Sequence, residues 1–465
     1  MGRLNKELGL LQGTGMMATS LLGTGIFVVP AVAASIAGAS SLWAWLLLMV
    51  LVLPVAFTFA RLGQTYPHAG GAPHLIGRAL GPAMEKLAAF LFLAVLPVGL
   101  PAALTLTAGF WHALFALSDA QDLLVQVGTL GLILLLGSRK TSASGLVQLL
   151  IALAIILLLL AIWWAGELLP AMPAFPTLPR VQWGLIPAAL AVMFWCYVGL
   201  EAFAHMGEEF RNPQRDFPLA LLFGVLLAGL VYLGCALAVI KFGVFGDELT
   251  NTTSIPVLMA GLLGEQARWA AALVGYLACF ASINIYVQGF ARLLWSLADE
   301  GKLPAGLARR NRHGAPFAAL AWVIGACALC VFAAWLFRLP LEVLIRYANG
   351  NFILVYLLAM LAGVRLLSGV YRGLALLGSL LCLGVFVSLG LEAAYALALG
   401  AGFIGWRYWR GRGKAHPMGN AYPLSSSSER DKLASHRHAV APSLGTLLRH
   451  PWRRRSAKKP THPVN

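Results

Sequence analysis

Long apolar runs recur along this chain, and they constrain its fold more than any other feature of the sequence. Twelve such runs lie between Leu8 and Trp406. The hydrocarbon core of a bilayer is about 30 Å thick, and a helix of roughly 20 apolar residues crosses it. Because 59% of the 465 residues are hydrophobic and only 11% are charged, water is not the main solvent of the folded chain. We therefore expect an all-α membrane protein with about 12 transmembrane helices.

Three of these runs, the fourth, eleventh and twelfth, are shorter than a usual membrane span, but the basic residues support them. With all twelve spans accepted, 16 Lys and Arg residues fall on one side of the membrane and 4 on the other. Cytoplasmic loops are the basic ones, so we expect both termini in the cytoplasm. The predicted spans are Leu8–Ala34, Leu42–Leu62, Leu87–Phe110, Leu123–Leu136, Gly145–Ala165, Trp183–Phe203, Leu219–Ile240, Trp269–Trp295, Pro316–Leu336, Leu341–Leu367, Leu374–Leu389 and Leu391–Trp406.

The composition changes after Trp406 to a polar and strongly basic segment. Such a segment cannot bury enough apolar surface to fold, so we expect a membrane domain at residues 1–408 and a disordered cytoplasmic tail at residues 409–465. The tail and the basic loops account for most of the net charge of +16. Next to a membrane, attraction to anionic lipid headgroups is favoured over binding of nucleic acid.

The sequence has no converging set of catalytic or metal-binding side chains. All six cysteines lie in apolar runs, where a thiol packs as a small hydrophobic group, and Cys327 and Cys330 have no His or further Cys nearby. Neither H-E-x-x-H nor G-x-S-x-G occurs. We therefore expect no metal ion, no cofactor and no enzymatic activity. A membrane-embedded enzyme and a channel remain as alternatives.

Glycine residues interrupt the first and the sixth apolar run. The first contains Gly23-Thr24-Gly25-Ile26-Phe27, and the sixth contains Gly199 two residues before the acidic Glu201. Glycine propagates a helix poorly, so we expect both helices to open there. Breaks five spans apart are typical of an inverted five-plus-five repeat, in which two discontinuous helices meet at the bilayer midplane. Broken helices 1 and 6 should therefore frame a binding site.

Four motifs in sequence order resemble the amino acid/polyamine/organocation transporter superfamily. They are Gly23–Phe27, Tyr66–Gly71, Gly199–Glu201 and Glu208–Pro218. Two further stretches resemble bacterial exporters of L-methionine and branched-chain amino acids, namely Leu96–Leu104 and Tyr276–Ser282. The resemblance implies a proton-coupled inner-membrane exporter of neutral, fairly apolar amino acids: methionine, leucine, isoleucine and valine. An importer or exchanger of the same superfamily is the alternative, because alternating access is reversible.

The same resemblance implies that the substrate binds at the two breaks. Amide groups around Thr24, Gly25 and Ile26 would hold its carboxylate, since the start of a helix presents unpaired N–H groups. Freed carbonyl groups would accept from its ammonium, and the Trp195 ring would close over it. Alternatively, Gly23 and Gly25 only permit close helix packing. The implied substrate-binding residues are Leu21, Gly23, Thr24, Gly25, Ile26, Trp195, Cys196, Tyr197, Val198 and Gly199.

The other polar residues of the spans indicate a neutral substrate side chain. Spans three and eight carry no acid at pocket depth. Arg346 is a costly cation at membrane depth, and Glu342, four residues before it, is its predicted partner. The polar pocket candidates are all uncharged, namely Asn284, Tyr347, Asn349 and Asn351.

Glu201 and His205 are the candidates for coupling transport to protons. They lie four residues apart, on one face of the sixth span. Burial in a low dielectric favours the protonated form of a carboxyl group, so a proton can bind there. An interfacial histidine bonded to the backbone is the alternative for His205. Span five contains no lysine, so the lysine of related proton-coupled carriers has no counterpart here.

Overall fold

The computed structural model describes residues 8–412 except residues 67, 69, 116, 139–140, 202–208 and 340. Nearly all of this part is helical, and its one extended pairing is a parallel bridge between Leu8 and Phe210. The chain divides into the units Met1–Tyr408 and Trp409–Asn465. Of the second unit, only the helical residues up to Arg412 are described. The predicted tail therefore lies almost entirely outside the described residues.

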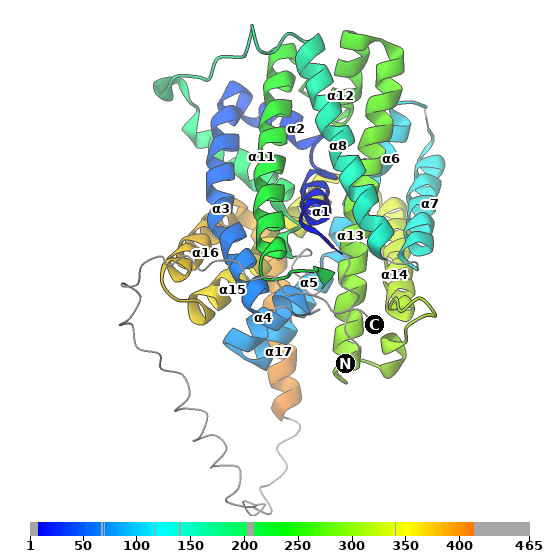
Figure 1. Ribbon diagram of the computed structural model, residues 1–465, viewed down its shortest axis with the longest axis vertical. Helices are drawn as coiled ribbons and strands as arrows, with labels where there is room; N and C mark the ends of the chain where they lie inside the picture. The colour runs from blue at the N-terminus through cyan, green and yellow to red at the C-terminus, as the bar shows by residue number, and fades with distance from the viewer. Residues whose placement is uncertain are drawn as a thin grey trace, which may run out of the picture. The chain divides into compact units, whose positions relative to one another are not determined.

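The helices follow the predicted apolar runs, and each run contains at least one helix (Figure 1). Eight helical segments of the described part are long and apolar enough to cross a membrane, so the protein is a multi-pass membrane protein. The number of twelve crossings and the inverted repeat stay predictions. The helices are α1 (Leu10–Leu22), α2 (Val29–Ala37), α3 (Ser41–Thr65), α4 (Gly71–Leu80), α5 (Pro82–Leu93), α6 (Leu96–His112), α7 (Asp119–Gly137), α8 (Thr141–Ala165), α9 (Ile186–Met193), α11 (Asp216–Phe242), α12 (Glu248–Leu263), α13 (Glu265–Asp299), α14 (Phe317–Leu336), α15 (Leu341–Leu366), α16 (Val370–Ser388) and α17 (Ala393–Arg412).

The short α1 lies inside the helical unit and packs against α8, α11 and α13 (Figure 1). Its residues Met17, Ala18 and Leu22 are fully buried. By contrast, large apolar side chains on the outer helices are exposed, such as Leu135 on α7 and Leu160 on α8. An exposed apolar exterior around a packed interior is what a bilayer requires, since lipid replaces water as the solvent.

Two helices, α4 and α12, lie between predicted spans and were not expected from the sequence. The start of α12 is capped by Asp247, whose Oδ1 accepts a hydrogen bond from the Thr250 amide at 2.8 Å. Farther along, the Ser254 hydroxyl donates to the Phe27 carbonyl at 3.0 Å. This contact places α12 directly beside the break in the first span.

Contacts between loops group them as the charge pattern predicts. Loops predicted to share the basic side contact one another through three pairs, Gln214–Gln64 (3.2 Å), Lys302–Glu85 (2.8 Å) and Asn311–Ser138 (2.9 Å). On the opposite side, Trp43 at the start of α3 donates to the Pro176 carbonyl at 2.9 Å, and Lys241 donates to the Gly166 carbonyl at 2.7 Å. The two groups of loops thus behave as two faces of one bundle. Which face meets the cytoplasm stays a prediction.

Arg346 is paired with a residue far along the chain. Its Nη1 lies 2.7 Å from Oε1 of Glu392, in the short turn between α16 and α17. The side chain of Glu342, the partner predicted from the sequence, lies outside the described residues. The cation is therefore compensated by an acid that sequence spacing could not identify.

Candidate functional site

The first span is broken between α1 and α2, as predicted. Residues 23–28 form turns in which the Ile26 amide donates to the Leu22 carbonyl at 3.0 Å. The amides of Thr24 and Gly25 have no backbone acceptor among the described residues. Two of the three amides predicted to face a substrate carboxylate are therefore available, whereas that of Ile26 is already bonded.

The sixth span is broken as well. Helix α9 ends at Met193, a 3₁₀ turn covers Phe194–Tyr197, and Val198 is extended. Gly199 follows with φ of +140°, a conformation that side chains strongly disfavour. Helical structure resumes at Leu200. This break requires a glycine at position 199 for conformational reasons.

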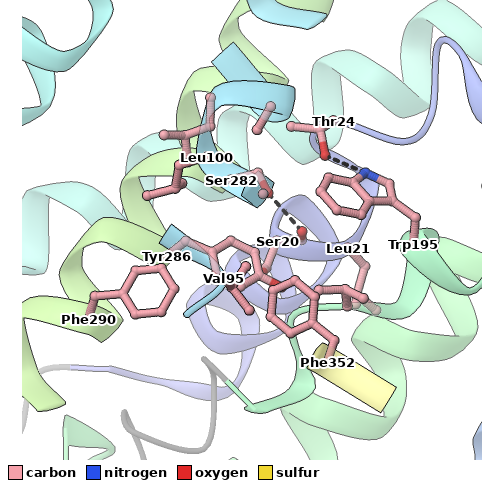
Figure 2. A pocket seen from close by; sticks show the side chains of 14 residues that line it. Ser20, Leu21, Thr24, Val95, Leu100, Trp195, Ser282, Tyr286, Phe290 and Phe352 are labelled. Carbon is pink, nitrogen blue, oxygen red and sulfur yellow. Dashed lines mark hydrogen bonds between the residues drawn. The ribbon is translucent and has the colours of Figure 1, made fainter. Parts of the chain in front are cut away.

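Hydrogen bonds hold the two breaks together and fix the first one in place. The indole N–H of Trp195 donates to the Thr24 hydroxyl at 3.0 Å (Figure 2). From α11, the Tyr232 hydroxyl donates to the Leu21 carbonyl at 2.7 Å. From α13, Ser282 donates to the Ser20 carbonyl at 3.0 Å. The carbonyl of Leu21, predicted to accept from a substrate ammonium, thus already accepts one hydrogen bond and keeps one free lone pair.

A pocket lies between the two breaks (Figure 2). No lining residue is charged, and most are apolar or aromatic. The lining residues are Ser20, Leu21, Thr24, Val95, Gly99, Leu100, Ala103, Trp195, Val198, Ser282, Ile283, Tyr286, Phe290 and Phe352.

Of the ten predicted substrate-binding residues, only some line this pocket. Leu21, Thr24, Trp195 and Val198 do so. The other six lie around the breaks but not on the pocket wall, namely Gly23, Gly25, Ile26, Cys196, Tyr197 and Gly199.

The two glycines of the first break are surrounded by protein atoms. A Cβ on Gly23 would lie 2.0 Å from Cβ of Ser282. A Cβ on Gly25 would lie 2.5 Å from the Tyr232 hydroxyl and 3.0 Å from Sγ of Cys196. Close helix packing, the alternative considered for these glycines, is therefore enough to explain why both positions are glycine.

Most of the pocket wall was missed by the sequence analysis. Helix α6 contributes Gly99 and Ala103, four residues apart, and α13 contributes Ile283, Tyr286 and Phe290 at helical spacing. This periodicity was visible in the sequence, but nothing in it showed which face of each helix points inward. Gly99 and Ala103 do lie within the stretch Leu96–Leu104 that resembles amino-acid exporters.

The polar candidates for side-chain recognition do not line the pocket. Asn349 donates to the Ala191 carbonyl at 3.2 Å. Asn351 approaches the Ala94 carbonyl at 3.4 Å, where α5 and α6 are separated by a short turn. Asn284 and Tyr347 are likewise absent from the wall. The buried amides of α15 thus bond to the backbone of neighbouring helices.

Glu201 is completely buried at the sixth-span break. Its Oε2 accepts hydrogen bonds from the Gly199 amide at 3.0 Å and from the Tyr356 hydroxyl of α15. The Tyr356 hydroxyl also lies 3.0 Å from the Tyr197 carbonyl. The carboxyl group therefore braces the break. The second coupling candidate, His205, lies outside the described residues.

Metal binding has no evident place in this region. Among the described residues, no group of three or more His, Cys, Asp or Glu side chains is arranged to hold a metal ion. The pocket offers a ligand unpaired amides, carbonyls and an apolar wall. Such a pocket suits a small zwitterion with an apolar side chain.

Sequence comparisons agree with this geometry. The profile described as amino acid permease matches residues 8–372. The L-methionine/branched-chain amino acid exporter YjeH of Escherichia coli (strain K12) is 49% identical over 402 residues, which cover 86% of this chain and 96% of that protein. The uncharacterized amino acid permease YecA of Bacillus subtilis (strain 168) is 25% identical over 83% of this chain and 90% of its own length. The cadaverine/lysine antiporter of Escherichia coli (strain K12) is 24% identical over 67% of this chain and 71% of its own length.

Proposed function

The chain belongs to the amino acid permease family, and from this we propose that it exports L-methionine, leucine, isoleucine and valine in exchange for protons. The observation that carries the proposal is the pocket between the two broken helices, whose lining residues carry no charge. An uncharged wall disfavours substrates with a cationic side chain such as lysine, since their charge would be buried without a partner. The similarity to a methionine and branched-chain amino acid exporter supports the same substrates.

The backbone of the substrate would be held at the two breaks. We assign its carboxylate to the unpaired amides of Thr24 and Gly25 and to the Thr24 hydroxyl, which precede the start of α2. We assign its ammonium to the carbonyl groups of Cys196 and Val198 at the sixth-span break, because those of Trp195 and Tyr197 already accept hydrogen bonds from the Val198 amide and the Tyr356 hydroxyl. Since every α-amino acid carries these two groups, this part of the site binds the substrate without selecting it.

The side chain of the substrate would be selected by the apolar wall. This part of the wall is formed by Val95, in the turn before α6, and by Leu100 of α6, Ile283 of α13 and Phe352 of α15. One methylene more or less in such a pocket changes affinity by only about 1–3 kcal/mol. The pocket should therefore accept several apolar amino acids of similar size and discriminate weakly among them.

Coupling is assigned to Glu201, the one acid that the described structure buries at a break. Its protonated and ionised forms would favour different states of the transport cycle, so a proton gradient could drive export. We place the protein in a bacterial inner membrane, with both termini and the basic loops in the cytoplasm, because 16 basic loop residues lie on one side and 4 on the other. The tail, residues 409–465, would lie next to anionic lipids.

Counterflow in proteoliposomes tests the substrate assignment. Purified protein is reconstituted, the vesicles are loaded with unlabelled methionine, and uptake of labelled methionine is followed. We expect saturable counterflow that leucine, isoleucine and valine inhibit and that lysine and cadaverine do not. Equal inhibition by lysine would contradict the uncharged pocket as the selective site. Flux that does not saturate and shows no counterflow would indicate a channel instead of a carrier.

The direction and orientation are tested separately. In vesicles oriented with the basic loops inside, an inward proton gradient should drive methionine from the lumen to the outside. Single cysteines placed beside Arg61 and Arg309 should react only with reagents that reach the cytoplasm. Labelling from the periplasmic side at either position would overturn the assigned topology.

A further inference from the structure

Tyr286, on α13, is part of the pocket wall at one end and lies near the buried acid at the other. Its ring packs 5.9 Å from the Phe352 ring and 6.3 Å from the Phe290 ring, centroid to centroid, and all three residues line the pocket (Figure 2). An amino acid in the pocket would therefore contact this aromatic wall. The phenol oxygen, in contrast, is buried away from solvent.

The Tyr286 hydroxyl points to the sixth-span break. A Cβ on Gly199 would lie 3.4 Å from this hydroxyl and 2.8 Å from the Ser20 hydroxyl of α1. The Gly199 amide donates to Oε2 of Glu201 at 3.0 Å, which brings the Glu201 carboxyl to the same part of the break. Because Gly199 has no side chain, groups from α1, α13 and the break converge on one buried spot.

Three oxygen atoms at this spot have no well-aligned hydrogen-bond partner among the described residues. They are Oγ of Ser20, the hydroxyl oxygen of Tyr286 and Oε1 of Glu201. The other carboxyl oxygen, Oε2, is bonded to Gly199 and Tyr356. Buried polar groups are nearly always paired in folded proteins, so three unpaired ones side by side call for a functional explanation. No charged side chain of the described part faces Glu201, and its titratable neighbours are Tyr286 and Tyr356.

We propose that Tyr286 couples occupancy of the amino-acid pocket to the protonation state of Glu201, through a hydrogen bond between its hydroxyl and Oε1. This inference rests on the proton-coupled transport proposed above. When Glu201 is ionised, Tyr286 donates to Oε1. When Oε1 carries a proton, the carboxyl donates to the Tyr286 oxygen, and Tyr286 donates to Ser20. No covalent bond changes except the one that carries the proton on Glu201.

Substrate binding and protonation of Glu201 are coupled because the ring of Tyr286 lines the pocket while its hydroxyl lies at the sixth-span break. A substrate that displaces the Tyr286 ring also displaces its hydroxyl, and so changes the relative free energies of the protonated and ionised carboxyl. By linkage, protonation of Glu201 changes substrate affinity by the same factor. Tyr286 acts as a positioning residue here, because it affects the proton only through Glu201.

The test is the ratio of pH-driven methionine accumulation to equal-pool methionine exchange, measured in proteoliposomes for each variant. Tyr286→Phe keeps the ring and removes the hydroxyl. We expect the ratio to fall about fivefold or more, the lower end of typical coupling between two sites, and to fall similarly in Glu201→Gln. Tyr276→Phe is the matched control on the same helix, because its hydroxyl lies 3.1 Å from that of Thr129 and outside the pocket. Its ratio should equal that of the wild type.

The outcomes separate this inference from the proposed function. A normal ratio in Tyr286→Phe with a reduced ratio in Glu201→Gln overturns the role of Tyr286 and leaves proton coupling intact. A normal ratio in Glu201→Gln overturns both. Proportional loss of accumulation and exchange in Tyr286→Phe would show a merely structural role. If that variant does not fold, Ser20→Ala replaces it: a shifted pH profile of accumulation supports the inference, and an unshifted profile overturns it.

Discussion

The indole N–H of Trp195 donates to the hydroxyl of Thr24 across 3.0 Å, and this hydrogen bond directly connects the two broken helices. Both residues also line the pocket. A substrate bound between the breaks must therefore either fit beside this bond or replace it. The contact makes Trp195 a component of the site and a link between its halves.

Trp195→Phe should weaken methionine binding while leaving the protein folded. The change removes the N–H but keeps an aromatic ring. The bond holds the two breaks in the arrangement that forms the pocket and contributes about 0.5–1.5 kcal/mol, so its loss should lower the population of that arrangement and raise the half-saturation concentration for counterflow by up to about 12-fold. Trp43→Phe is the control, because its indole donates to the Pro176 carbonyl at 2.9 Å, away from the pocket. An unchanged half-saturation concentration in Trp195→Phe would exclude the bond from the site.

Gly25→Ala should abolish transport because of packing between helices. The added Cβ would meet the Tyr232 hydroxyl at 2.5 Å, so the first break would have to move away from α11. Adding Tyr232→Phe should restore part of the counterflow, since it removes the closest clashing atom. Gly128→Ala, on α7 with no atom near its new Cβ, is the control and should behave as wild type. No recovery in the double variant would favour the other hypothesis, in which Gly25 is needed for the approach of the substrate carboxylate.

Two substitutions of Glu201 should separate its bracing role from its titration. Glu201→Gln can still accept hydrogen bonds from Gly199 and Tyr356, so it should lose pH-driven accumulation more than exchange. Glu201→Leu removes both bonds and leaves the Gly199 amide only its hydrogen bond to the Tyr356 hydroxyl at 3.2 Å, so the break loses its brace and both activities should fall. The two transport assays measure this difference. Equal losses of both activities in Glu201→Gln, with an unchanged pH dependence, would reject a coupling role.

Gly99→Ala should alter substrate preference. Gly99 lines the pocket, and a Cβ there would lie 2.6 Å from Cγ1 of Val95, so the wall must shift into the available space. Affinity for methionine and leucine should fall by about 10-fold, and affinity for the smaller valine should fall less. Competition against labelled methionine measures this order. Gly109→Ala, on the same helix with open space around its Cβ, is the control. An equal change for all substrates would argue against selection at this wall.

Arg292→Leu should destabilise the fold. Nη2 of Arg292 on α13 lies 3.1 Å from Oε1 of Glu209, and both side chains are at most 10% exposed. The change removes the cation from a buried ion pair, and breaking such a pair from one side costs about 3–5 kcal/mol. Thermal unfolding in detergent should show a clearly lower midpoint. Arg268→Gln breaks an exposed pair with Glu265 on the same helix and should change stability by no more than about 1 kcal/mol. Similar unfolding midpoints for the two variants would contradict the argument that a buried ion pair matters more to stability than an exposed one.

Predictions from the sequence succeeded where one local property decides the structure. The membrane runs were recognisable because a bilayer of fixed thickness demands apolar helices of a given length. The breaks were recognisable because Gly23, Gly25 and Gly199 disfavour a continuous helix whatever surrounds them. The family motifs pointed to the same two breaks and to an amino acid transporter.

The features that the sequence analysis missed depend on which helices pack against one another. The helix α12 was missed because its residues include Thr, Asn and Pro and form no long apolar run. The partner found for Arg346 is 46 residues away, at Glu392. Neither periodicity nor spacing along the chain reports such contacts.

The amino-acid sequence by itself determined that the chain enters a membrane, where its helices break and which transporter family it joins, because each of these follows from neighbouring residues. Only the tertiary structure decided which side chains form the pocket and which merely pack. Gly25 contacts Tyr232 instead of lining the pocket, and Tyr286 reaches from the pocket wall to Gly199 at the sixth-span break. The physical reason is that the inward face of a helix is set by its neighbours, and in a membrane both faces of a helix are apolar.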